Sequence, residues 1–224
     1  MSLKAKPYGS KNALQLLANN HPDVFAKAIN SHNVQWISPI KADHYKEHCN
    51  NFPELGVTSQ SLNEFWPQRG PQWDGIAIDK DRGEYLLIEA KAHISELFNT
   101  NSRAKESSAQ LIAKRLQELS NNLKSKHYIK EFWQGSLYQT ANRLAFLDFL
   151  NKKSAKEWHN KVKLVYLIFL DNPIADKYAF SEARETQNAW ITALSIAEQQ
   201  LLSLPKRHKL TKHIKHVFIS CQDL

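Results

Sequence analysis

Apolar and polar positions recur along the chain with two periods, and these periods predict the order of its elements. Apolar residues three or four positions apart predict helices, and short apolar runs between turn residues predict strands. Helices are expected over 10–29 (with a break at Pro22), 42–49, 59–66, 106–124, 133–151 and 181–203, and strands over 34–40, 73–79, 83–93, 163–171 and 216–221.

The best-defined strands are "WDGIAID" and "GEYLLIEAKAH", which flank the polar segment "KDRG" and so predict a hairpin. The run 163–171 is almost wholly apolar, as in a strand covered on both faces. The order of helices, hairpin, helices, strand, helix and strand predicts an α/β fold with a central mixed β-sheet flanked by helices. We expect residues 1–224 to form a single domain.

The second hairpin strand ends in two charged residues, Glu89 and Lys91. Strand side chains alternate, so these two share one face while Ala90 points to the other. Burying an isolated charge costs several kcal/mol, so the strand emerges into solvent, forms an ion pair at the sheet edge, or lines a site. If the hairpin turns at Asp81-Arg82-Gly83, Asp74 lies across from Glu89 and joins the other two.

Two carboxylates beside an ammonium group suit the chemistry of phosphate esters. Divalent ions such as Mg²⁺ prefer oxygen ligands, and they polarise phosphoryl groups. A neighbouring Lys can position the attacking water and counter the charge that builds up on the phosphate.

"PQWDG" and "IEAK" together resemble the signature of the PD-(D/E)XK nuclease superfamily, although two residues separate Pro71 from Asp74 where the signature has adjacent residues. The resemblance implies a restriction-endonuclease-like fold. Its core of a helix, a three-strand meander, a helix and a further strand would occupy about residues 55–171, between a helical N-terminal extension and a basic C-terminal helix-strand extension. The resemblance also implies that Asp74, Glu89 and the Ala90 carbonyl bind Mg²⁺ or Mn²⁺, and that Lys91 activates water.

The same resemblance suggests further site residues. Many members add a glutamate from the helix before the meander, and Glu64 is the candidate here, ahead of Glu47 and Glu54. Some members carry Gln-x-x-x-Tyr on the helix after the motif, which corresponds to Gln134 and Tyr138. Gln139, Asn142 or Arg143 are the alternatives for the polar part. His93 either contacts phosphate or caps the strand, and Arg69 is a candidate for substrate contact.

Charge then narrows the class of partner. The formal net charge is +8 and the pI is about 9.4, which favours a polyanion such as DNA. The basic residues cluster in 101–130 and in 204–216. The second cluster includes Lys206, Arg207, Lys209 and Lys212, which either form a solvated face or grip a phosphate backbone.

The remaining features exclude some classes of protein. Two cysteines are too few for a disulfide framework, and no apolar run is long enough to cross a membrane, so we expect a cytoplasmic protein. His44 and His48 stand one helical turn apart beside Cys49, but we expect structural or surface roles for them. A homodimer is possible, because many such nucleases cut both strands as dimers.

The sequence thus predicts a Mg²⁺-dependent nuclease that hydrolyses phosphodiester bonds in DNA, of restriction or repair type. The alternatives are a non-catalytic nucleic-acid-binding protein on a nuclease-like fold and a hydrolase of small phosphoesters.

Overall fold

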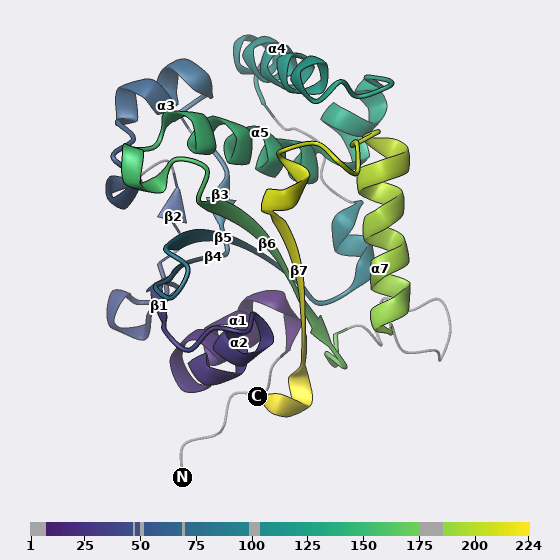
Figure 1. Ribbon diagram of the computed structural model, residues 1–224. Coiled ribbons are helices and arrows are strands. Elements are labelled where there is room, and N and C mark those ends of the chain that lie inside the picture. Colours follow the sequence, from purple (N-terminus) through teal and green to yellow (C-terminus); the bar gives the residue numbers. More distant parts are fainter. Residues whose placement is uncertain (1–7, 47, 50–51, 69, 99–103, 175–185) are drawn as a thin grey trace.

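A five-stranded mixed sheet forms the centre of the computed structural model, which describes residues 8–46, 48–49, 52–68, 70–98, 104–174 and 186–224 (Figure 1). The strand order is β1-β4-β5-β6-β7. The first three strands form an antiparallel meander, and β6 and β7 then add parallel to β5. The strands are β1 (Val34–Ser38), β4 (Gly75–Asp79), β5 (Glu84–Lys91), β6 (Val162–Leu170) and β7 (Ile214–Ser220).

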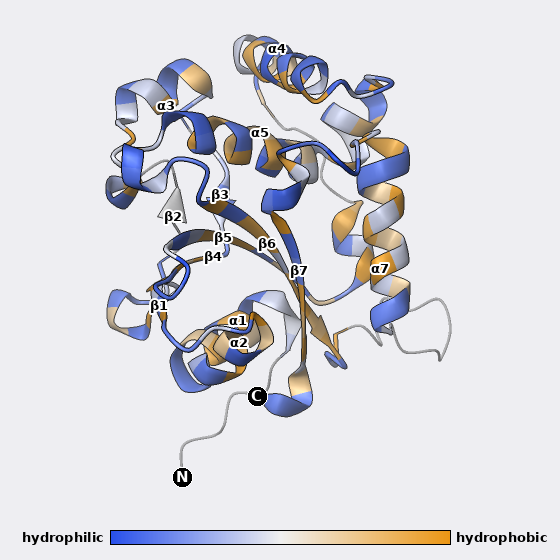
Figure 2. Cartoon of the chain, in the orientation of Figure 1, coloured by the Kyte–Doolittle hydropathy of each residue, from blue (hydrophilic) through white to orange (hydrophobic). Residues whose placement is uncertain are grey.

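Helices cover both faces of this sheet. Helices α1 (Gly9–Asn20) and α2 (Pro22–Ala28) pack on one face, and α3 (Ser59–Phe65), α4 (Glu106–Leu123), α5 (Tyr138–Lys153) and α7 (Gln187–Ser195) pack on the other. Each face has its own buried apolar cluster, and Figure 2 shows the hydrophobic residues concentrated on the central strands. The predicted α/β fold with a mixed sheet between helices is confirmed.

Short elements complete the chain. A two-stranded ribbon pairs β2 (His48–Cys49) with β3 (Gln72–Trp73), and η4 (Glu131–Ser136) and η6 (Ile196–Leu201) are π-helical turns. The 3₁₀ turns are η1 (Lys41–Asp43), η2 (Pro53–Leu55), η3 (Ile94–Leu97), η5 (Lys156–Trp158), η7 (Thr211–His213) and η8 (Cys221–Asp223). Among the described residues, no helix is both long enough and apolar enough to cross a membrane.

Three predicted elements need correction. The helix expected over 42–49 is wrong, because η1 ends at Asp43 and β2 follows. The helix expected over 133–151 is interrupted at Gly135, whose backbone is not helical (φ −107°, ψ −116°), so α5 begins only at Tyr138. In place of the helix expected over 181–203, the structure has α7 followed by the π-helical turn η6, which ends at Leu201. Residues 175–185 lie outside the described residues, so the start of the expected helix is not covered.

The sheet also reaches beyond residues 55–171 in both directions. β1 begins at Val34 and is the first strand of the meander, and β7 ends at Ser220 on the opposite edge. The helices that precede the meander are therefore α1 and α2, and α3 lies within the connection between β1 and β4. The segments expected as extensions contribute both edge strands and one of the two helical layers.

Gly75 allows β1 and α1 to pack closely at the start of β4. A Cβ atom at this position would lie 3.2 Å from the Ser38 carbonyl oxygen, 3.3 Å from Trp36 Cζ3 and 3.4 Å from Leu14 Cδ2. The two contacts with β1 are tighter than most Cβ atoms show, so a larger residue here would press against Ser38 and Trp36. The same packing fixes the position of the preceding residue, Asp74.

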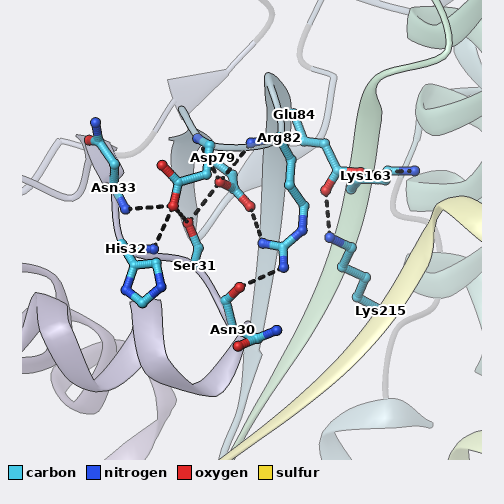
Figure 3. A network of polar contacts seen from close by, with 10 residues as sticks. Asn30, Ser31, His32, Asn33, Asp79, Arg82, Glu84, Lys163 and Lys215 are labelled. Atoms are coloured by element: carbon cyan, nitrogen blue, oxygen red, sulfur yellow. Dashed lines mark hydrogen bonds and ion pairs between the residues drawn. The ribbon is translucent and has the colours of Figure 1, made fainter.

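A buried carboxylate holds the β4–β5 hairpin turn (Figure 3). Asp79 is fully buried, accepts hydrogen bonds from Ser31 Oγ (2.8 Å) and Asp81 N (3.1 Å), and pairs with Arg82 Nη1 at 2.8 Å. Burial alone would raise the pKa of Asp79, but the bonds from Arg82 and Ser31 lower it below 3.8 overall. Next to the turn, Glu84 pairs with lysines of β6 and β7, Lys163 (3.3 Å) and Lys215 (2.5 Å).

Asp79→Ala should lower the free energy of unfolding by about 2–4 kcal/mol, because it leaves buried donors without their acceptor. Asp148→Ala is the matched control, since it removes an Asp that pairs with a largely exposed lysine, Lys152, and should cost less than about 0.5 kcal/mol. Urea unfolding at neutral pH measures both values. Similar losses for the two variants would contradict the role given to Asp79.

Candidate functional site

The hairpin register brings Asp74 to the charged end of β5. Gly75 pairs with Ile88, so Asp74, one residue earlier, lies at the level of Glu89. Asp74 Oδ2 accepts a hydrogen bond from the Ala90 N–H at 2.9 Å. Asp74, Glu89 and Lys91 therefore meet at one end of the hairpin, opposite the turn held by Asp79.

Glu89 is a buried carboxylate paired with two cations. Its side chain is 1% exposed, and its oxygens lie 2.6 Å from Lys91 Nζ and 2.6 Å from Arg143 Nε. A carboxylate this deeply buried requires partners, because an uncompensated charge there would cost several kcal/mol. The expected ion pair between Glu89 and Lys91 is present, but it is buried and includes Arg143 as a second cation. The alternative that the strand emerges into solvent is wrong.

Arg143 comes from the middle of α5 and is fixed by contacts of its own. Nη2 donates to the Gln72 carbonyl oxygen at 2.7 Å, Nη1 donates to Asn142 Oδ1 at 3.3 Å, and the guanidinium lies 4.8 Å from the centre of the Trp73 ring. The planar guanidinium can make all of these contacts at once, which a lysine could not. Arg143 therefore links α5, the segment before β4 and the end of β5.

Lys91 reaches the same helix through Gln139, whose Oε1 accepts a hydrogen bond from Nζ at 2.9 Å. Gln139 and Arg143 stand four residues apart on one face of α5. Gln134 and Tyr138 do not contact Lys91 or Glu89 in this way: Gln134 donates to Tyr128 Oη at 2.6 Å, and Tyr138 Oη accepts from Asn142 at 3.4 Å. The break at Gly135 separates Gln134 from α5. Two of the alternatives named from the sequence, Gln139 and Arg143, make the contacts with Lys91 and Glu89 instead.

The two carboxylates have pKa values shifted in opposite directions. Burial and the nearby charge of Glu89 raise the pKa of Asp74 from 3.8 to about 7, against the opposing effects of Lys91 and Arg143. Burial would also raise the pKa of Glu89, but Arg143 and Lys91 lower it overall. Glu89 is therefore the ionised member of the pair, and Asp74 holds its proton up to near neutral pH in the absence of another cation.

The structure separates other predicted residues from this cluster. Glu64 lies exposed on α3 and accepts a hydrogen bond from Gln60 at 3.0 Å, so it does not join Asp74 and Glu89. Glu64 was predicted to join the site on the assumption that α3 is the helix before the meander. The helices that precede the meander are α1 and α2. His93 is buried and contacts Ser95 (2.6 Å) and Glu96 (3.2 Å), which agrees with a role in ending the strand. Arg69 lies outside the described residues.

The C-terminal basic segment lies at the other end of the sheet. Ile214, which follows the segment, pairs with Leu164 and is thus level with Leu87. His213 contacts the Val162 carbonyl at the level of Tyr85. Lys91 is six residues further along β5 than Tyr85, which corresponds to about 20 Å of strand length. The exposed residues Lys206, Arg207, Lys209 and Lys212 therefore do not line the candidate site.

Asp74 lines a small surface pocket. Lys11, Leu14 and Gln15 of α1 form one side of this small pocket, and Pro39 and Tyr45 form the other. Glu89 and Lys91 are 1% and 5% exposed and are not part of the lining of this pocket. Asp74 is thus the contact between the buried network and the surface.

A row of polar residues continues from Glu89 across the sheet. Tyr166 of β6 pairs with Glu89, and His216 of β7 pairs with Tyr166. Burial raises the pKa of Tyr166 well above 10, and the charge of Glu198 adds to the shift. His216 Nε2 lies 3.0 Å from Glu198 Oε1, on the π-helical turn η6. His216 was expected in the basic segment 204–216, and the sequence carries no signal for this row because it depends on the pairing of β6 and β7.

The oxygen atoms around Asp74 are of the kind that hard divalent ions prefer, but few side chains supply them. Among the described residues, no group of three or more His, Cys, Asp and Glu side chains converges on one point. Two carboxylates do converge, and like charge between them contributes to the raised pKa of Asp74, a cost that a bound cation would relieve. Asp74 Oδ1 has no hydrogen bond within the described part of the chain. Asp74, Glu89 and the Ala90 carbonyl are the oxygen donors that could hold Mg²⁺ or Mn²⁺ here, although each Glu89 oxygen already lies 2.6 Å from a cation.

Comparison of the chain with models of protein families, with curated proteins and with solved structures finds no match.

Asp74→Asn should stabilise the metal-free protein at pH 8 by about 1–2 kcal/mol. This is less than the whole shift of the Asp74 pKa would give, because the side chain is partly exposed and solvent screens its charge. The folded-state pKa is raised, so the stability that Asp74 contributes is fully present below about pH 4 and is lost as the pH rises through about 7. The gain should therefore vanish at pH 4.

Urea unfolding in EDTA at the two pH values measures this difference. Asp79→Asn is the opposing control: its pKa is lowered, so this variant should be destabilised at pH 8. An Asp74→Asn variant that is less stable than the wild type at pH 8 would contradict the raised pKa.

Proposed function

We propose that the protein is a Mg²⁺-dependent nuclease of the restriction-endonuclease-like type that hydrolyses phosphodiester bonds in DNA. The observation that carries this proposal is the convergence of Asp74, Glu89 and Lys91 at the end of the hairpin. Two carboxylates for a metal and an ammonium group for a water and a phosphate are the groups that phosphodiester hydrolysis needs. The raised pKa of Asp74 is a further sign of a functional site.

The topology supports the same proposal. Helices α1 and α2 precede the meander β1–β4–β5, and α4 and α5 follow it before β6 adds parallel to β5. This is the order of elements that the PD-(D/E)XK resemblance implies, with the core starting at α1 instead of near residue 55. Glu89 lies on β5, and Asp74 directly precedes β4, the neighbouring strand of the meander.

Each residue would have a distinct part in the reaction. Asp74, Glu89 and the Ala90 carbonyl would hold the metal, which when bound polarises the phosphate and acidifies water. Lys91 would orient the attacking water and counter the charge on the phosphate, and Gln139 and Glu89 fix its ammonium group. The DNA backbone would approach through the pocket at Asp74, where Lys11 offers an exposed positive charge.

One observation favours the alternative, a non-catalytic nucleic-acid-binding protein on a nuclease-like fold. Lys91 and Arg143 together already neutralise Glu89 without a metal. A protein of that kind would bind DNA equally well in EDTA and in Mg²⁺, and its DNA would remain intact.

Lys91→Ala should reduce DNA cleavage at least about 100-fold, because it removes the group that positions water and counters charge. The assay incubates supercoiled plasmid, linear duplex, single-stranded DNA and RNA with the protein in Mg²⁺, Mn²⁺ or EDTA. Lys163→Ala is the matched control, since it breaks a lysine–glutamate pair at the far end of the sheet and should cut normally. Cleavage in EDTA, or full activity of Lys91→Ala, would refute the assignment.

The basic segment should contribute to DNA binding and not to metal binding. Lys206→Ala combined with Arg207→Ala should weaken DNA binding and lower the salt slope by about one for each phosphate that the segment no longer neutralises. Fluorescence anisotropy across a salt series measures both quantities, and Lys27→Ala with Lys152→Ala is the charge-matched control. An unchanged slope would show that this segment is only a solvated face.

A further inference from the structure

Arg143 stands where a bound cation would have to interact with Glu89. Its Nε lies 2.6 Å from Glu89 Oε2, and its side chain is 7% exposed. The contacts to Gln72, Asn142 and the Trp73 ring hold the guanidinium there independently of Glu89. The arginine is therefore a fixed positive charge built into the wall of the candidate metal site.

This charge has two opposite effects. Without a metal, it compensates Glu89, which would otherwise be a buried anion with only Lys91 as a partner. When a divalent ion approaches, the same charge repels it and competes for the Oε2 atom, because like charges a few ångströms apart repel each other. Asp74, the other carboxylate, has no side-chain cation in direct contact among the described residues, although the charges of Lys91 and Arg143 still act on it from nearby.

We propose that Arg143 is a positioning residue that takes the place of the metal beside Glu89 and releases Glu89 Oε2 when a divalent ion binds. The inference rests on the proposed function, because it requires that Asp74 and Glu89 bind Mg²⁺. In this proposal Glu89 is held in place by Arg143 before the metal binds, and the charge of Arg143 lowers the affinity of the site for the metal. A residue with a purely structural role would instead support metal binding, since its loss would disorder Glu89.

The first experiment measures Mn²⁺ binding to purified protein without DNA, from the electron paramagnetic resonance signal of free Mn²⁺. Arg143→Gln removes the charge and should bind Mn²⁺ about tenfold more tightly than the wild type. Arg143→Lys keeps the charge while losing the guanidinium geometry, and should stay within about threefold of the wild type. Lys163→Gln makes the same change in net charge at the far end of the sheet and should leave the affinity unchanged.

The second experiment uses the wild-type protein, so it decides the matter even if Arg143→Gln fails to fold. The Nε–H of Arg143 donates to a buried carboxylate, so its proton should exchange slowly in the metal-free protein. Mg²⁺ should shift this resonance in ¹⁵N NMR and speed its exchange at least about tenfold. Arg115, whose Nε–H donates to the Phe65 carbonyl at 3.1 Å on another element, provides the reference signal and should not respond.

The outcomes separate the two proposals. Tighter Mn²⁺ binding by Arg143→Gln and a responsive Arg143 resonance support the inference. If the wild type binds Mn²⁺ but Arg143→Gln binds it equally or more weakly, or if the resonance does not respond to Mg²⁺, the inference is overturned and the proposed nuclease stands. If no folded variant binds Mn²⁺ and Asp74→Asn changes nothing, the metal site and the proposed function both fall.

Discussion

The carboxylate of Glu89 is the constraint on which the organisation of the site depends. It lies near the end of β5, after four fully buried residues (Tyr85 to Ile88), and its own side chain is almost without contact with water. A charge in that position is tolerable only with partners of opposite sign, which Lys91 supplies from the same strand and Arg143 supplies from α5. The ion pairs thereby tie the helical layer to the sheet at one defined point.

Several other features of the fold follow from this arrangement. Arg143 bonds the backbone of Gln72 and packs over Trp73, so the chain that leads into β4 is fixed against α5. Gly75 then lets α1 approach on the other face. Asp74 is held between these two layers, buried enough to have a raised pKa and exposed enough to reach a surface pocket. The same packing that stabilises the hairpin gives Asp74 and Glu89 their opposite pKa shifts.

Local signals in the sequence predicted the hairpin, and the hairpin predicted that Asp74 and Glu89 meet, because turn residues and strand alternation together define register. The partners on α5 depend on how that helix is rotated over the sheet, which is a property of long-range packing. In the packed structure Gln139 and Arg143 face the strand, and the break at Gly135 leaves Gln134 outside α5. The prediction for Glu64 is wrong because β1, far back in the sequence, opens the meander.

The central claim is that Asp74 and Glu89 bind one divalent ion beside Lys91. A crystal structure of the protein soaked in Mn²⁺, with the anomalous signal of manganese recorded, tests it most directly. The account predicts a single strong anomalous peak in contact with both carboxylates and the Ala90 carbonyl, with Arg143 Nε withdrawn from Glu89. If a crystal soaked at a saturating concentration of Mn²⁺ shows no peak between the carboxylates and an intact Glu89–Arg143 pair, the claim is contradicted.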